Sequence, residues 1–220
     1  MPQPPATPAG ARPARQQRSR RAAEAIARAA RSLLQEQQFD ELSVADVARA
    51  AGTSVGGFYA RFPHKEALLE VLHAGVIDEM RQALDDALAA VDSPDHGARV
   101  VIEAYVNTMV RQFRLHRREV LQIRKYAGAD RTGTYGRRTA EFNAHVHGRV
   151  RTLLRARSAE FGHSDPAFAI DFGLFTASAA AREAVLAGSL AAYPIDVDDE
   201  RLIREIARTW ASYLRMPEDA

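Results

Sequence analysis

The chain of 220 residues is long enough to bury a substantial core, and its 46% hydrophobic and 26% charged side chains are typical of a soluble globular protein. It contains no cysteine, which excludes disulfides, thiol catalysis and thiolate metal sites and agrees with the cytoplasmic location that we expect. No apolar run approaches the roughly 18 residues that a membrane span needs, so we expect no membrane partner.

The net charge of +2 conceals an uneven distribution along the chain. Residues 1–65 carry net +5 and residues 111–157 carry net +10, whereas residues 66–110 carry −7 and residues 158–220 carry −6. A basic N-terminal block is what a phosphate-binding surface requires. The basic block of residues 111–157 allows two interpretations: a site for an anionic ligand, such as an acyl chain with a charged head, or salt bridges to the acidic blocks, which we favour.

Residues 1–19 hold five of the ten prolines and no large aliphatic side chain, so they predict a disordered basic tail. Its arginines are either solvated or form an arm that follows DNA phosphates. The acid-free start also fits a transit peptide, an alternative that we favour less. From residue 20 to residue 38, apolar side chains at Ile26, Ala30 and Leu33 recur at helical spacing and predict the first helix.

The most informative pattern follows in residues 43–69. Ser43 precedes an apolar helical pattern and Asp46 comes three residues later, a capping box that predicts a helix start at Ser43. Gly52 predicts its end, because a helix C-terminus favours a residue with positive φ. A second, short helix is predicted over residues 54–62, although each of its two glycines costs about 1 kcal/mol relative to alanine.

Two adjacent glycines in so short a helix indicate that tertiary packing holds it and that its backbone is closely approached. We expect Val55, Phe58 and Phe62 to supply the packing, and the glycines to let the backbone approach DNA. Hydroxyl groups and cations nearby suit phosphate oxygens and base edges. The candidate DNA-binding residues are Ser43, Thr53, Ser54, Val55, Gly56, Gly57, Tyr59, Arg61, His64 and Lys65. The alternative is a glycine-rich loop with a solvated tyrosine and arginine.

The stretch from Thr53 to Leu68, TSVGGFYARFPHKEAL, resembles the helix-turn-helix signature of the tetracycline-repressor (TetR) family, and the resemblance covers about residues 20–70. It implies a homodimeric transcriptional regulator that binds double-stranded operator DNA. We expect a repressor that a small, largely apolar effector releases from its operator. A DNA-binding protein without a ligand and a helical interaction protein are the alternatives.

The resemblance also divides the candidate residues by role. It places Ser43, Ser54, Gly57, Tyr59 and Lys65 where the family contacts DNA, mostly phosphates. It places Thr53, Val55, Gly56 and Arg61 at or beside the positions that set base readout. His64 departs from the family pattern, which usually has a short polar cap there, and histidine caps a helix less well.

The remaining chain predicts further helices, and no segment alternates as a strand would. We therefore expect an all-α fold with an N-terminal three-helix helix-turn-helix domain over residues 20–65. A larger helical effector-binding and dimerisation domain is expected over residues 66–220, in line with the family. The helix predicted from Asp165-Pro166 to about residue 190 carries two apolar stripes and therefore needs two partners.

One of these partners is expected to be the protein's own core and the other a second subunit, unless the helix is fully buried in a monomer. The candidate interface residues are Ala177, Ala181, Val185, Ile206, Trp210 and Tyr213. An effector pocket is expected between helices, although aromatic residues at helical spacing more often belong to a plain core. The candidate pocket residues are Tyr105, Met109, Phe113, Tyr126, Phe142, Phe172 and Phe175.

The sequence offers no catalytic site. It has no nucleophile elbow, phosphate loop or dinucleotide fingerprint, so we expect neither an enzyme nor a cofactor. His145 and His147 are two positions apart on a predicted helix and point to different faces, so they do not form a metal pair. We therefore expect no metal site.

Overall fold

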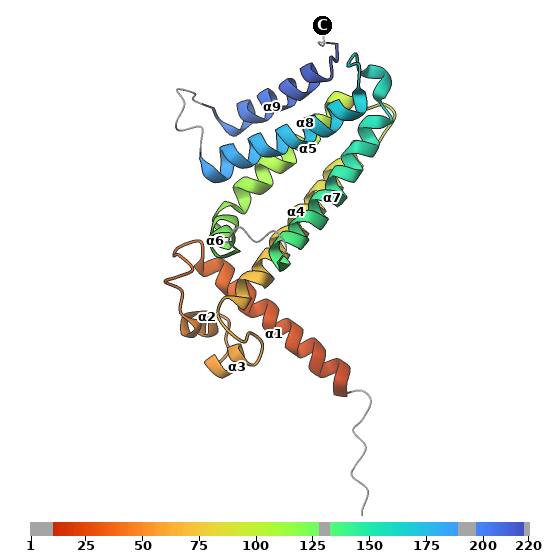
Figure 1. Cartoon of the computed structure of the whole chain (residues 1–220). Coiled ribbons are helices and arrows are strands. Elements are labelled where there is room, and N and C mark those ends of the chain that lie inside the picture. The colour runs from red at the N-terminus through yellow and green to blue at the C-terminus, as the bar shows by residue number, and fades with distance from the viewer. Residues whose placement is uncertain (1–10, 128–132, 189–196, 218–220) are drawn as a thin grey trace, which may run out of the picture. The chain divides into compact units, whose positions relative to one another are not determined.

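The structure, a computed structural model, describes residues 11–127, 133–188 and 197–217, and these residues contain helices and no strand (Figure 1). The all-α prediction is confirmed. The helices are α1 (Ala11–Leu33), α2 (Val44–Ala50), α3 (Val55–Tyr59), α4 (Ala67–Ala90), α5 (Ala98–Leu115), α6 (Arg117–Ala127), α7 (Thr134–Arg155), α8 (Pro166–Arg182) and α9 (Asp199–Tyr213), with a 3-10 turn at Ser158–Glu160 and a π-turn at Glu183–Ala187. The chain divides into two compact units, Met1–Leu72 and His73–Ala220.

The first helix begins earlier than its apolar pattern predicts. α1 starts at Ala11, so the prediction of a disordered tail is wrong for residues 11–19, while residues 1–10 lie outside the described part of the chain. Alanine, arginine and glutamine are good helix formers, and Pro13 is tolerated because it lies in the first turn, where backbone amides have no helical acceptor. The helix therefore extends beyond the apolar residues that anchor it.

The local signals around α2 and α3 are confirmed. The Ser43 hydroxyl accepts a hydrogen bond from the Asp46 amide at 3.0 Å and so caps α2. Gly52 has φ +67°, and the amides of Gly52 and Thr53 donate to the carbonyls of Arg49 (3.1 Å) and Ala48 (2.9 Å). These two bonds form a Schellman motif, which ends α2 and sets the direction in which the chain enters α3.

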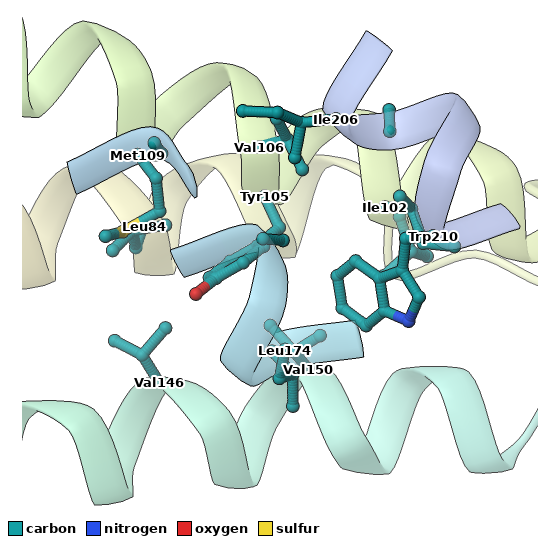
Figure 2. Packing of buried hydrophobic residues seen from close by; sticks show 14 of the residues in the cluster. Leu84, Ile102, Tyr105, Val106, Met109, Val146, Val150, Leu174, Ile206 and Trp210 are labelled. Atoms are coloured by element: carbon teal, nitrogen blue, oxygen red, sulfur yellow. The ribbon is translucent and has the colours of Figure 1, made fainter. Parts of the chain in front are cut away.

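The larger unit is built around α5, which packs against α6, α7, α8 and α9. Its core contains side chains from α4, α5, α7, α8 and α9 (Figure 2). Tyr105 of α5 and Trp210 of α9 are among the largest fully buried side chains, and their rings meet edge to face with centroids 6.0 Å apart. Two bulky aromatic groups thus fill the space between α5, α8 and α9.

Helix α8 starts as predicted and ends earlier. The Asp165 carboxylate accepts from the Phe168 amide at 3.1 Å, and Pro166 occupies the first turn, where its missing amide has no cost. The helix then widens into the π-turn, and Gly188 with φ +68° ends it, rather than residue 190. Arg117 Nε donates to the Val185 carbonyl at 2.8 Å, so an acceptor of the π-turn is satisfied from α6.

Arginines of the basic block pair with acidic residues of both neighbouring blocks. Arg149 Nη1 lies 2.9 Å from an Asp85 oxygen, and His145 bonds to the same carboxylate at 2.9 Å. Partial burial alone would raise the pKa of Asp85, but these two hydrogen bonds hold it below its ordinary value. The further pairs are Arg111–Glu200, Arg114–Asp199 and Arg151–Asp171. This arrangement supports the salt-bridge interpretation of residues 111–157 over the anionic-ligand one.

Candidate nucleic-acid interface

Helix α3 is short, and side-chain contacts at both of its ends hold it in place. The Ser54 hydroxyl accepts from the Gly57 amide at 3.0 Å and caps its start. Phe58 is completely buried and Phe62 nearly so, and their ring centroids lie 5.1 Å apart. The predicted packing role of these two phenylalanines is confirmed, and it explains how a five-residue helix with two glycines persists.

Val55 does not share this packing role. Its side chain is 43% exposed and that of Tyr59, one turn later, is 52% exposed. The prediction that Val55 packs onto the preceding helices is therefore wrong, since its side chain, unlike that of Phe58, is exposed. The exposed surface of α3 also includes Ser54, Gly56 and Ala60. Sequence reasoning overlooked Ala60, although its spacing of four from Gly56 places both on one helix face.

The two glycines differ in what the fold requires of them. A Cβ atom built on Gly57 would lie 2.3 Å from Thr53 Oγ1, so a side chain fits there only if the Thr53 hydroxyl turns away. A Cβ on Gly56 would meet nothing closer than Ser54 Oγ at 3.8 Å, which is ordinary contact. Contacts within the chain therefore favour glycine at position 57 but not at position 56. Close approach of another molecule to the backbone remains the main explanation for Gly56.

Arg61 and His64 are engaged with backbone groups. Arg61 Nη1 donates to the Gly57 carbonyl at 2.7 Å, and its buried Nε has no hydrogen-bond partner among the described residues. His64 Nδ1 accepts from the Ala67 amide at 3.2 Å and lies 3.3 Å from a Glu66 carboxylate oxygen. The histidine thus does cap the start of α4, in the place where we expected a weak cap.

Lys65 has a structural role that the sequence did not predict. Its Nζ donates to the carbonyls of Phe39 (2.9 Å) and Leu42 (3.0 Å), lies 3.4 Å from that of Asp40, and sits 4.7 Å from the centroid of the Phe39 ring. An ammonium group has three donors, and all three are directed at this chain. Lys65 therefore clamps the segment that joins α1 to α2, and its phosphate contact stays a prediction.

We expect Lys65→Met to lower the free energy of unfolding by about 1–3 kcal/mol, because three carbonyls lose a charged donor. Chemical denaturation of the full chain measures this loss. Arg49→Met is the matched control: Arg49 pairs with Asp46, its side chain is 78% exposed, and we expect less than about 0.5 kcal/mol. A clamp leaves the salt dependence of DNA binding unchanged below the melting temperature. If Lys65 instead contacts a phosphate, Lys65→Met reduces the slope of log affinity against log salt concentration by about 0.9.

The predicted pocket residues differ in how deeply they are buried. Tyr105, Met109 and Phe142 belong to the packed core, and Phe113 and Tyr126 are half-buried. Phe172 and Phe175 are 41% and 65% exposed, so their assignment to an internal pocket is wrong. An open groove of about 290 Å³ does occur elsewhere. It is lined by Asp92, His145, Gly148, Arg149, Thr152 and Leu153, none of which we predicted.

A hydroxyl pair joins buried Tyr105 of α5 to half-buried Ser178 of α8. Tyr105 Oη and Ser178 Oγ are 2.6 Å apart, and Ser178 Oγ also donates to the Leu174 carbonyl at 2.6 Å. Burial raises the pKa of Tyr105 to about 12, so this phenol is neutral at physiological pH. Sequence reasoning missed Ser178, because nothing in a small residue on an alanine-rich helix marks it as the partner of a tyrosine on α5.

The two apolar stripes of α8 exist, but the stripe that is buried is the reverse of the predicted one. Of the six predicted interface residues, Tyr213 is half-buried and five are buried within this chain: Ala177, Ala181, Val185, Ile206 and Trp210. The other stripe, Phe168, Phe172 and Phe175, is exposed and forms a continuous row. Its ring centroids are 5.7 Å and 6.3 Å apart, and Phe172 also lies 5.4 Å from Tyr213 of α9. We call these three phenylalanines the α8 aromatic face.

Two further classes of site, a membrane-spanning helix and a metal site, are absent from the described part of the chain. No helix there is both long and apolar enough to cross a bilayer. No group of three His, Asp or Glu side chains within the described ranges is arranged to hold a metal ion.

Residues 26–72, which contain α2, α3 and the start of α4, match the family described as bacterial regulatory proteins, tetR family. The transcriptional regulator EthR of Mycolicibacterium smegmatis is 38% identical over 103 residues, which is 46% of this chain and 47% of EthR. The regulator YwcC of Bacillus subtilis is 29% identical over 89 residues, covering 36% of this chain and 40% of YwcC. The matches thus span less than half the length of these relatives.

Solved structures resemble the chain over most of its length. A protein from Mesorhizobium loti assigned to the TetR family has a TM-score of 0.67 at 19% identity, covering 90% of this chain and 97% of that one. The fatty acid degradation regulator FadR from Bacillus halodurans has a TM-score of 0.60 at 18% identity, with coverages of 89% and 97%. These likenesses show a shared fold. Residues 26–72 therefore carry the likeness to the tetR family, and most of the chain shares its fold with solved structures assigned to that family.

Proposed function

We propose that this protein is a homodimeric transcriptional repressor that binds operator DNA through α3 and leaves it when a small, largely apolar effector binds. The observation that carries DNA binding is the exposed surface of α3 within the family's helix-turn-helix. Its Ser54, Gly56 and Tyr59 are exposed, and caps and buried phenylalanines fix the helix beneath them. A rigid helix with an open backbone position suits close contact with a DNA groove.

The α8 aromatic face supports the dimer. Three phenylalanines in a row, each more than two-fifths exposed, form an apolar surface that water solvates poorly. A second copy of the same face would cover it through a two-fold interface, as most homodimers do. Two subunits also supply two reading helices for two half-sites on one side of the duplex, spaced by about 34–36 Å.

The effector part of the proposal concerns the larger unit. The Tyr105–Ser178 pair places two hydroxyl groups beside apolar core residues, the mixture of groups that small-molecule sites use to orient a ligand. The FadR structure, which shares the fold, belongs to a regulator of fatty acid degradation, so free fatty acids are the first probes to use. A rise in melting temperature with ligand concentration would reveal binding.

We expect Gly56→Ala to raise stability slightly and to weaken DNA binding at least tenfold. The added methyl has room in the protein and improves helix propensity by about 1 kcal/mol, but it would separate the α3 backbone from DNA. Fluorescence anisotropy with duplexes selected from a random library measures the affinity, and thermal melting measures the stability.

A gain in stability together with a loss of DNA affinity excludes misfolding as the cause of weaker binding. Val71→Ala is the control, because Val71 is 40% exposed on α4 and outside the α3 surface. Wild-type affinity in Gly56→Ala would show that α3 is not the reading helix. Failure of the wild-type protein to select any duplex would rule out the proposed function itself.

A further inference from the structure

The exposed surface of α3 lacks the side chains that usually read base pairs through hydrogen bonds. The exposed positions of α3 and the residue after it are Val55, Gly56, Tyr59 and Ala60. Arginine, asparagine and glutamine make the bidentate contacts to guanine and adenine, and none of them is among these residues. Arg61, the next residue, directs Nη1 to the Gly57 carbonyl at 2.7 Å. Direct readout by α3 therefore needs another kind of contact.

The shape of this surface suits the C5-methyl group of thymine. Val55 is 43% exposed, and a β-branched side chain in a helix keeps nearly one rotamer, so its two methyl groups are held in place. Gly56 beside it presents no side chain, and the space that a Cβ would take there is open apart from Ser54 Oγ at 3.8 Å. Apolar side chains recognise thymine by contact with its methyl group in the major groove.

We propose that Val55 is a specificity-determining residue that reads a thymine methyl, so each operator half-site has an A·T pair whose thymine lies against Val55. This inference rests on the proposed function, because it assumes that α3 enters the major groove. Tyr59 lies one turn further along the same flank of the helix, and its phenolic hydroxyl suits a phosphate oxygen. Base discrimination on this flank is then assigned to Val55 alone.

The test uses duplexes that the wild-type full-length protein selects from a random library. In the selected half-site, each thymine is replaced in turn by deoxyuridine, which pairs identically and lacks only the C5-methyl group. We expect one position in each half-site to lose about threefold to tenfold in affinity and the others less than twofold. In Val55→Ala the penalty at that position should fall below twofold, since the methyl contact has already been lost.

A matched variant identifies the source of the penalty. Val71→Ala removes an equally exposed valine from α4 and should keep the full deoxyuridine penalty. A selected half-site without thymine, uniform tolerance of deoxyuridine, or a penalty that persists in Val55→Ala would each overturn the proposal for Val55 while leaving DNA binding intact. If no duplex is selected above background, the proposed function fails, and this inference fails with it.

Discussion

Gly173→Ala should destabilise the larger unit by at least about 3 kcal/mol, the largest effect that we expect from a single methyl group in this protein. A Cβ atom on Gly173 would lie 1.7 Å from Trp210 Nε1 and 2.0 Å from its Cδ1, closer than non-bonded atoms can approach. The indole is buried, packs edge to face on Tyr105, and occupies the core where α9 meets α8 (Figure 2). Either the indole leaves the core or the two helices separate.

Trp210 is the single tryptophan of the chain, so its fluorescence reports this site alone. We expect a red-shifted emission and a melting temperature lower by about 10 °C. Gly148→Ala is the matched control, because nothing lies within 4 Å of a Cβ there and helix propensity favours alanine. In a Trp210→Leu background, Gly173→Ala should cost much less. Unchanged emission and melting in Gly173→Ala would contradict this packing.

Replacing Phe168 and Phe175 together by glutamate should convert the proposed dimer into a monomer of 24.2 kDa. Both side chains are more than half exposed, and their ring row would be buried between two copies. Four carboxylates in a two-fold interface lose hydration and repel one another, which a surface of this kind cannot compensate. Operator affinity should fall about 100-fold or more, because two half-sites are then bound independently.

Light scattering at several concentrations measures the mass, and anisotropy measures the affinity for the selected duplex. Leu115→Glu provides the control, because Leu115 is an equally exposed apolar residue, 67% exposed, at the end of α5. It should leave both mass and affinity unchanged. A double variant that remains dimeric would show that the α8 aromatic face is not the subunit interface.

The sequence predicted the helix-turn-helix best, because local interactions specify it. The capping serine Ser43 and the positive φ of Gly52 each depend on a few neighbouring residues, and both were found where expected. The role of Lys65 was not predictable in this way. Its acceptors lie 23 to 26 residues earlier in the chain, so spacing carries no sign of them.

The two stripes of α8 show a different limit. Helical periodicity correctly separated Phe168, Phe172 and Phe175 from the small and aliphatic residues on the other side. Periodicity cannot tell which stripe faces the protein, and we assigned the larger rings to the interior. The structure reverses this choice because Trp210 needs a glycine and small residues opposite it, so Gly173 and Ala177 turn inward. The bulk of one side chain on α9 thus decides which face of α8 remains exposed.

The carbonyl groups around Lys65 also bear on a peculiarity of the composition. Of the 30 basic side chains only two are lysines, so this chain uses arginine almost wherever a positive charge is needed. Three carbonyl oxygens that converge on one nitrogen require a compact tetrahedral donor, whereas the planar guanidinium spreads its N–H groups outward. An arginine at this position would therefore not fit among the three carbonyl oxygens, although the exchange keeps the charge. The geometry of these hydrogen bonds accounts for a lysine at position 65 in an arginine-rich protein.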